Sequence, residues 1–422
     1  MWRAGYRLLL WLALPFVLLR LWWRGRQEPR YRESPGERFG FYRTAATKPV
    51  IWLHAVSLGE TRAAEPLLRA LQRRHPDCDL LITQMTATGR EAARALLGGS
   101  GHVAWLAYDY PFAVKRFLRH FRPRLGILME TEIWFNLVAE CGRSGVPLML
   151  ANARMSARSA RGYASVAPLT RAALQGLGAI AAQTAEDAGR LMSLGALGVE
   201  VTGNLKFDVE PDAGSESLAA QFRRWFGDRR VLLAASTREG EEELLLEASE
   251  RDSLNGALTV IVPRHPQRFD AVAQLLAGRS LKFARRSAGD PVPAECGYVL
   301  GDSMGEMAAY YRACDVAFIG GSLLAYGGQN LIEACAAGKP VLIGPHTYNF
   351  AQAAESAVAA GAALRVDRAD DVLRLARELL ANPEQRARMG KAGIDFCAAH
   401  RGATQRTLAI CERLLGEGTA TR

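Results

Sequence analysis

Short apolar segments recur along most of the chain, and segments with helical periodicity separate them. In the first half, the apolar segments that predict strands cover residues 50–53, 80–83, 103–106, 125–129, 148–151, 179–182 and 199–202. The intervening segments space their apolar residues as amphipathic helices do, for example in residues 61–72, 88–97, 111–119 and 132–144. Because helices separate the strands, we expect a parallel sheet with helices on both of its faces.

A second series of the same kind follows a polar, mixed stretch. Its predicted strands cover residues 231–235, 258–262, 298–300, 316–319, 340–343 and 363–365. A chain of 422 residues is also too long for one core. The pattern therefore predicts an α/β protein with two Rossmann-like, doubly wound domains. We expect the first at residues 31–210, a linker at 211–228, and the second at 229–422, ending in C-terminal helices. The helical tail, residues 383–415, either closes the second domain or reaches back across the cleft between the domains.

The amino-terminal segment, residues 1–30, predicts a membrane anchor. Its apolar part, residues 8–19, is shorter than the ~20 residues that a full span needs. It can be lengthened if Arg20 snorkels and Trp22 and Trp23 lie at the interface. No small-residue cleavage site follows, so we expect an uncleaved anchor, either a short span or a helix lying in the interface. Arginines are denser after the apolar part than before it, which predicts a cytoplasmic body.

Amino-acid composition limits the classes of molecule that the chain is expected to bind. The net charge of +10 and the pI of about 9.4 favour anionic partners. No nucleic-acid-binding signature is present, which leaves anionic lipid or a phosphorylated substrate. Seven cysteines without C-x-x-C spacing argue against zinc and disulfides and for a reducing compartment. The first strand is followed by neither G-x-G-x-x-G nor a Walker A loop, so an NAD enzyme or P-loop NTPase is not expected.

In the predicted first domain, charged residues follow three strands. Ser57 to Glu60 fits the S-x-x-E capping box, in which the glutamate only reaches back to the start of the helix. Alternatively Glu60 is a general base, because ligands bind at the carboxyl ends of strands in open α/β sheets. Glu130 and Glu132 are either partners of a helix dipole or ligands for a sugar hydroxyl or a developing cation. Lys206 is either a surface lysine or an anion-binding residue.

The predicted second domain carries polar groups after several strands. Two further S-x-x-E boxes, Ser236 to Glu239 and Ser303 to Glu306, are either plain caps or anion sites at helix amino termini. Arg264 follows another strand and is suited to phosphate. A glycine-rich loop, residues 320–328, opens a predicted helix on which Asn330 and Glu333 share one face and can hold ribose hydroxyls. Taken together, these groups predict a nucleotide pocket.

Several motifs together carry a family resemblance. They are, in chain order, WLHAVSLGE, ETEIWFN, NARMS, GNLKFD, STREGEEE, PRHPQRF, GDSMGEM and GGQNLIEACAAGKPVLIGPHTYNF. This combination resembles the 3-deoxy-D-manno-octulosonic acid (Kdo) transferases of Gram-negative bacteria. The resemblance implies the GT-B glycosyltransferase fold, with two domains facing a cleft. It also implies transfer of Kdo from CMP-Kdo to the tetraacyldisaccharide lipid A precursor (lipid IVA), in lipopolysaccharide biosynthesis at the cytoplasmic side of the inner membrane.

The resemblance also assigns site residues. It implies that Glu60 is the catalytic base of an inverting reaction and that Glu130 and Lys206 stabilise the transition state, without a metal ion or cofactor. The segments that it places on CMP contain Pro263, Arg264, Met304, Gly305, Glu306, Asn330, Leu331, Ile332 and Glu333. A carboxylate base that is ionised at neutral pH is expected to need little adjustment of its pKa.

The chain departs mildly from the family pattern. Phe135 stands where a smaller residue or proline is frequent, Ser303 replaces a threonine, and Gln329 replaces a histidine. Two other interpretations stay open. One is a GT-B relative that uses a UDP-sugar, such as a lipid-linked glycosyltransferase or an epimerase. The other is a non-catalytic, membrane-tethered module that binds anionic lipid or nucleotide.

Overall fold

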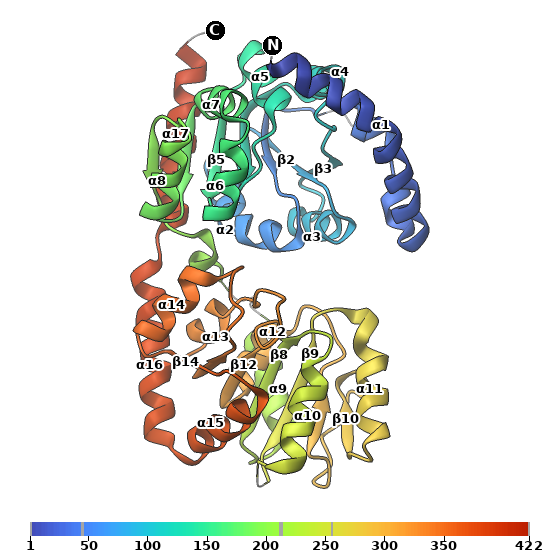
Figure 1. The fold of residues 1–422 in the computed structure, drawn as a ribbon, viewed down its shortest axis with the longest axis vertical. Coiled ribbons are helices and arrows are strands. Elements are labelled where there is room, and N and C mark those ends of the chain that lie inside the picture. Colours follow the sequence, from blue (N-terminus) through green and yellow to red (C-terminus); the bar gives the residue numbers. More distant parts are fainter. Residues whose placement is uncertain (1, 44–45, 211–213, 255, 421–422) are drawn as a thin grey trace. The chain divides into compact units, whose positions relative to one another are not determined.

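The computed structural model describes residues 2–43, 46–210, 214–254 and 256–420 (Figure 1). The chain forms two compact units, each of which is described by itself. Unit 1 runs to Val209 and takes up the chain again from His400, while unit 2 comprises Glu210–Ala399. Each unit is built on one seven-stranded parallel sheet, as the alternation of apolar and amphipathic segments predicts.

The sheet of unit 1 contains all seven strands that the sequence predicts. They are β1 (Val50–His54), β2 (Asp79–Gln84), β3 (Gly101–Trp105), β4 (Pro123–Met129), β5 (Leu148–Ala153), β6 (Ala179–Ala182) and β7 (Val199–Val201). Their order is β3-β2-β1-β4-β5-β6-β7. Strand order therefore reverses between β1 and β4, and at such a switch point the carboxyl ends of the two strands leave room for a ligand.

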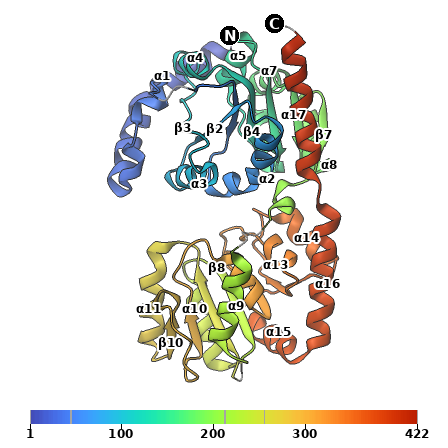
Figure 2. The ribbon, with the colours of Figure 1, turned by 180° about the vertical axis from the view of Figure 1, so that it is seen from behind.

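Helices cover both faces of this sheet (Figures 1 and 2). The amino-terminal helix is α1 (Trp2–Gln27), followed by two 3₁₀ turns, η1 (Pro29–Arg32) and η2 (Pro35–Phe39). On one face, a buried cluster joins the strands to α2 (Leu58–Arg74), α3 (Ala87–Leu97) and α17 (Ala403–Ala420). On the other face, a second cluster joins them to α4 (Pro111–Phe121), α5 (Phe135–Arg143), α7 (Ala167–Gln175) and α8 (Ala185–Ser193). The remaining elements of unit 1 are α6 (Ala157–Ala164) and η3 (Leu205–Asp208).

The carboxyl-terminal helix corrects one predicted boundary. Residues 229–422 were expected to form the second domain, but α17 belongs to unit 1. The physical reason is its apolar side, because Leu408, Ile410, Cys411 and Leu414 are buried in the same cluster as α2. An amphipathic helix buries this side wherever a complementary apolar surface is exposed, and the sheet face beside α2 provides it.

The predicted linker, residues 211–228, is also wrong in part. Residues 211–213 lie outside the described residues, but the rest forms α9 (Ser215–Phe226), a helix of unit 2. Its Phe222 stacks on Tyr310 of α12 (Met307–Ala313), with ring centroids 4.6 Å apart. The polar composition of this stretch therefore reflects a surface helix with one buried side.

Unit 2 repeats the architecture of unit 1. Its strands are β8 (Val231–Thr237), β9 (Leu258–Pro263), β10 (Phe283–Arg285), β11 (Tyr298–Leu300), β12 (Val316–Ile319), β13 (Val341–Ile343) and β14 (Ala363–Arg365). Their order is β10-β11-β9-β8-β12-β13-β14, with the reversal between β8 and β12. The sequence prediction missed only β10, a three-residue strand at the sheet edge whose side chains are half-buried. Its other helices and turns are α10 (Glu241–Arg251), η4 (Pro266–Arg268), α11 (Phe269–Gly278), η5 (Arg286–Ala288), α13 (Ile332–Ala336), α14 (Ala351–Ala359), α15 (Ala369–Ala381) and α16 (Pro383–His400).

Candidate active site

Glu60 lies in the first turn of α2, which begins just beyond the carboxyl end of β1. Ser57 caps this helix, as predicted, and its Oγ accepts from the backbone N–H of Glu60. The Glu60 carboxylate turns back toward the strand, so that Oε2 accepts from the backbone N–H of Val56 at 2.8 Å. Its Oε1 lies 3.1 Å from Ser57 Oγ, which donates to it. The cap therefore fixes the direction of the carboxylate at the switch point of the sheet.

The environment of Glu60 changes its acidity. Burial, together with the negative charges of Glu130 and Glu132, raises the pKa of Glu60 from its ordinary value to about 7. The hydrogen bonds from Val56 and Ser57 oppose this shift. The expectation that this carboxylate needs little adjustment of its pKa is therefore wrong. A carboxylate with a pKa near neutral pH is a stronger base than an exposed one, which suits proton abstraction.

Glu130 and Lys206 form an ion pair at the same edge of the sheet. Lys206 Nζ lies 3.0 Å from Glu130 Oε1, and each side chain is less than one-fifth exposed. Glu130 directly follows β4, whereas Lys206 lies in η3, after β7. Three predicted site residues of unit 1, Glu60, Glu130 and Lys206, are thus brought together from distant parts of the chain.

The backbone at this edge adopts unusual conformations. Glu130 has φ +57° and Asn152, in β5, has φ +53°, a region that residues other than glycine seldom occupy. The Oδ1 atom of Asn152 accepts from the backbone N–H of Leu205 at 3.0 Å and so holds the turn that presents Lys206. Strained residues of this kind gather at functional sites. Sequence reasoning missed the role of Asn152, although a polar residue inside an apolar strand was a usable signal.

Glu132 is a third carboxylate in this group. Burial raises its pKa, and it accepts from Nε1 of Trp134, whose ring meets that of His54 edge to face at 5.9 Å. His54, at the end of β1, is fully buried, and burial lowers its pKa to about 4. Its Nδ1 lies 3.0 Å from the carbonyl oxygen of Thr83, so the neutral ring donates from Nδ1. His54 and Trp134 are therefore two uncharged rings in contact with each other, and Trp134 also contacts the carboxylate of Glu132.

In unit 2, cationic side chains gather beyond the carboxyl ends of β8 and β9. Burial lowers the pKa of His265, and the positive charges of Arg238, Arg264 and Arg268 lower it further. Arg264 follows Pro263 at the end of β9, and its backbone N–H donates to the carbonyl oxygen of Thr237 at 3.0 Å. Three guanidinium groups around one imidazole make this edge suitable for an anionic ligand.

The box from Ser236 to Glu239 had two interpretations, a plain cap or an anion site, and the plain cap is wrong. Helix α10 begins only at Glu241, after Gly240. The fully buried Glu241 instead accepts from three backbone N–H groups, those of Arg238, Gly321 and Leu323. This carboxylate joins the loop after β8 to the glycine-rich loop after β12, on the two sides of the switch point. Ser236 has φ +56°, which makes it a third non-glycine residue with left-handed backbone at a strand end.

The predicted box from Ser303 to Glu306 also differs from a helix cap. Glu306 is itself the N-cap of α12, and its carboxylate accepts from Arg286 at 2.8 and 3.1 Å and from Ser303 Oγ. Gly305 has φ +84°, which favours glycine, and Met304 is half exposed. Arg286 lies in η5, and nothing in the spacing of the sequence indicated its pairing with Glu306.

Asn330 and Glu333 lie beside each other, but Asn330 precedes α13 and does not share a helical face with Glu333. Asn330 Nδ2 donates to Glu333 Oε1 at 2.8 Å, and its Oδ1 accepts from the backbone N–H of Ile332. The side chains of Leu331 and Ile332 are buried, so these two residues can reach a ligand only through their backbone. Among the residues that the structure describes, no group of three or more His, Cys, Asp or Glu is arranged to hold a metal ion.

Comparison with known proteins identifies the fold. A family described as 3-deoxy-D-manno-octulosonic-acid transferase (kdotransferase) matches residues 33–209, and glycosyl transferases group 1 match residues 275–396. A glycosyltransferase from Rickettsia africae has a TM-score of 0.60 at 12% identity, covering 88% of this chain and 99% of its own. A putative UDP-N-acetylglucosamine 2-epimerase from Listeria monocytogenes has a TM-score of 0.60 at 15% identity, covering 88% and 98%. Both show the fold alone, and the predicted GT-B fold is confirmed.

Two relatives share a higher sequence identity with this chain than these solved structures do. The chain is 46% identical to a 3-deoxy-D-manno-octulosonic acid transferase of Bordetella pertussis, over 99% of this chain and 100% of the relative. It is 38% identical to the enzyme of the same description from Haemophilus influenzae, over 98% and 99%. Identity at this level across nearly the whole length shows that the chain belongs to the Kdo transferase family.

Proposed function

We propose that this glycosyltransferase transfers Kdo from CMP-Kdo to the tetraacyldisaccharide precursor of lipid A (lipid IVA), with inversion at the transferred carbon. The observation that carries the proposal is the partly buried carboxylate of Glu60, with a pKa of about 7, in a chain of the Kdo transferase family. A single base at the carboxyl edge of a parallel sheet suits one direct displacement.

Glu60 takes the proton from the attacking hydroxyl of the acceptor. Its two oxygens are held by Val56 N–H and Ser57 Oγ, so the carboxylate keeps its direction before the acceptor arrives. Fixed orientation of the base lowers the entropic cost of reaching the transition state. Because Glu60 is ionised only above a pH of about 7, the reaction slows in acid.

Glu130 and Lys206 act on the charges that develop in the sugar. Loss of CMP leaves positive charge at the transferred carbon, which the carboxylate of Glu130 stabilises. Lys206 orients Glu130 through their 3.0 Å ion pair. Its ammonium group can also attract the carboxylate that an octulosonic acid carries. Such preorganised charges contribute most where water is excluded, and both side chains are largely buried.

Unit 2 binds the CMP group. The guanidinium of Arg264, with Arg238 and Arg268 nearby, stabilises the phosphate as its negative charge grows on departure. Asn330 and Glu333, already paired, hold the ribose hydroxyls. The amide groups of the loop around Gly305 and Glu306 are available to the base or phosphate. In this arrangement, guanidinium groups and backbone amides supply the electrostatic stabilisation of the departing phosphate.

The acceptor lies at the cytoplasmic side of the inner membrane. Helix α1 is long and apolar enough to insert into a membrane. The net positive charge of the chain favours an anionic, phosphorylated glycolipid. With the protein held at the bilayer, the acyl chains of the acceptor can stay in the lipid while its sugar reaches Glu60.

Nucleotide-dependent thermal unfolding tests the donor. Because a ligand that binds the native state raises its stability by mass action, CMP is expected to raise the unfolding temperature of the purified chain. UDP at the same concentration is the matched control, since it serves the alternative class of UDP-sugar enzymes. Protection by UDP and not by CMP would contradict the proposal.

A further inference from the structure

Helix α1 has two different sides. Residues on one side are partly covered at helical spacing, namely Tyr6, Leu10, Ala13, Leu14, Val17 and Leu21. The opposite side, which we call the outer face, consists of the exposed residues Leu8, Leu9, Leu12, Phe16, Leu19 and Trp23. Each outer-face side chain is more than half exposed, and Phe16 reaches 79%. A continuous exposed row of this kind is not expected in contact with water.

The amino-terminal half of α1 is docked on unit 1 (Figures 1 and 2). Tyr6 OH donates to Oδ2 of the buried Asp109 at 2.8 Å. Arg7 Nε donates to Oδ1 of the buried Asn136 at 3.2 Å. Farther along, the hydroxyl of Tyr110 donates to the carbonyl oxygen of Leu10 at 2.7 Å. These are polar contacts with the body of the protein, and a helix segment inside hydrocarbon could not make them.

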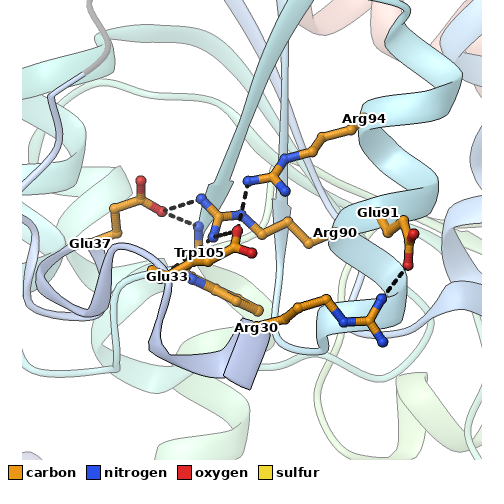
Figure 3. A network of polar contacts seen from close by, with 7 residues as sticks. All are labelled: Arg30, Glu33, Glu37, Arg90, Glu91, Arg94 and Trp105. Atoms are coloured by element: carbon orange, nitrogen blue, oxygen red, sulfur yellow. Dashed lines mark hydrogen bonds and ion pairs between the residues drawn. The ribbon is translucent and has the colours of Figure 1, made fainter. Parts of the chain in front are cut away.

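The chain that follows α1 is tied to the same unit (Figure 3). Arg30 pairs with Glu91 of α3 at 2.5 Å. In η2, Glu37 accepts from the backbone N–H of Trp105 at 2.8 Å. Four more contacts join Glu33 and Glu37 to α3 and β3, namely Glu33 with Arg90 and Arg94, Glu37 with Arg90, and the carbonyl oxygen of Glu33 with Trp105 Nε1. Both ends of α1 are therefore attached to unit 1.

These attachments leave too little helix for a span. Beyond Leu14, the last residue of the docked half, 13 residues remain to Gln27, and at 1.5 Å per residue they cover about 20 Å. The hydrocarbon core of a bilayer is about 30 Å thick. This remaining part also contains Arg20, Arg24 and Arg26, all exposed. Length and composition alone would allow α1 to cross a membrane, but its contacts do not.

We propose that α1 lies flat in the interface of an anionic bilayer, with its outer face among the acyl chains, and does not cross it. The proposal rests on the proposed function for its membrane setting. Charge supports an anionic lipid surface, because exposed basic side chains lie along α1 and also on α4, at Lys115, Arg116 and Arg119. Basic side chains at the edge of an apolar helix face attract anionic headgroups.

This placement also links the membrane to the active site. Tyr6 meets Phe135 edge to face at 5.1 Å, and Arg7 contacts Asn136. Both partners begin α5, directly after the segment that carries Glu130 and Glu132. The docked half of α1 therefore fixes the height of the catalytic edge above the bilayer surface. A lipid acceptor would reach that edge from the side, without leaving the membrane.

Site-specific labelling distinguishes a flat helix from a span. Ala4→Cys and Gln27→Cys place thiols at the two exposed ends of α1, in a Cys78→Ser background because the other six cysteines are buried. Sealed inside-out inner-membrane vesicles are treated with a membrane-impermeant maleimide, before and after detergent. We expect both variants to be labelled fully without detergent. Labelling of Ala4→Cys only after detergent would overturn the proposal. The readout is independent of turnover, so it stands whether or not the Kdo assignment holds.

Vesicle flotation tests the outer face. The purified full chain is mixed with vesicles containing phosphatidylglycerol, and the fraction that floats is measured. Combining Leu12→Gln, Phe16→Gln and Leu19→Gln is expected to lower the bound fraction at least about ten-fold, because three apolar side chains that would insert among the acyl chains are lost. The matched control changes two exposed residues elsewhere on unit 1, Met192→Gln and Leu197→Gln, and is expected to float like the wild type.

Two outcomes of this assay would overturn the proposal. One is flotation of the triple variant at the level of the wild type. The other is a wild type that does not float and forms dimers that the triple variant separates, as measured by light scattering. The second result would assign the outer face to another copy of the chain. Circular dichroism of the triple variant confirms that loss of flotation does not follow from unfolding.

Discussion

The hydroxyl of Ser57 offers a direct test of how the acidity of Glu60 is set. Ser57 Oγ donates to Glu60 Oε1 at 3.1 Å and accepts from its backbone N–H at 3.4 Å. Replacement by Ala removes a donor that favours the ionised carboxylate, so the pKa of Glu60 rises above about 7. A hydrogen bond to a charged group contributes about 1.5–3 kcal/mol, and at this length we take about 1 kcal/mol. At 1.36 kcal/mol per tenfold change, the pKa rises by about 0.7.

The assay is the pH dependence of kcat/KM, which reports groups in the free enzyme. The wild-type rate is expected to fall tenfold per pH unit below about 7, because protonated Glu60 cannot accept a proton. For Ser57→Ala we expect the acid limb to move upward, so that kcat/KM falls about five-fold below wild type at acid pH. At alkaline pH, where Glu60 is ionised in both proteins, the rates converge.

A second capping residue controls for loss of stability. Thr184 caps α8 by accepting from the backbone N–H of Asp187 at 3.0 Å, and Thr184→Ala loses a cap of similar strength, about 1 kcal/mol. We expect its acid limb to coincide with the wild type. An acid limb of Ser57→Ala that stays in place or moves to lower pH would refute the reasoning, since the base would then be another group or the hydroxyl would not donate to it.

Three further predictions concern other parts of the chain. Lys206→Met removes the ion-pair partner of Glu130 and is expected to lower kcat about a hundred-fold while CMP binding is retained. Turnover assays and calorimetric titration with CMP check this, and unchanged turnover would contradict a catalytic role for the pair. Arg264→Ala is expected to weaken CMP binding about ten-fold or more in the same titration, whereas equal affinity would place the phosphate elsewhere. Asp208 accepts from two backbone N–H groups at the start of α17. Asp208→Ala is therefore expected to lower the free energy of unfolding of unit 1 by about 1–2 kcal/mol, as urea denaturation can measure. An unchanged unfolding midpoint would show that this cap does not contribute to stability.

The strands were predictable because parallel strands buried on both faces are continuous apolar runs. Seven strands of unit 1 and six of the seven in unit 2 were predicted on this basis, although the edge strands β7 (Val-Glu-Val) and β14 (Ala-Leu-Arg) follow the rule only in part. The exception, β10, is an edge strand whose sequence, Phe-Ala-Arg, is too short and too mixed to stand out. The unit on which α17 packs could not be predicted, because the apolar side of a helix does not specify which of two domains will cover it.

The positions of the candidate site residues after the strands could be predicted from the sequence, but the interactions of these residues could not. Glu60 could be located by its position after β1, but its raised pKa depends on burial and on Glu130, seventy positions away. The choice between Glu239 and Glu241 depended on the left-handed backbone of Gly240, which moves the start of α10. Local capping patterns could not reveal that Glu241 holds two loops together across the switch point.

The central claim is that Glu60 is the base of a Kdo transfer from CMP-Kdo. The most direct measurement is CMP release from CMP-Kdo in the presence of the tetraacyl lipid A precursor and EDTA, for the wild type and Glu60→Gln. Gln keeps the size of the side chain but cannot take the proton. We predict CMP and a Kdo-bearing lipid from the wild type, and a rate reduced by at least about a thousand-fold in the variant, with CMP binding intact. Turnover of Glu60→Gln at the wild-type rate would contradict the account and leave Glu60 as a helix cap.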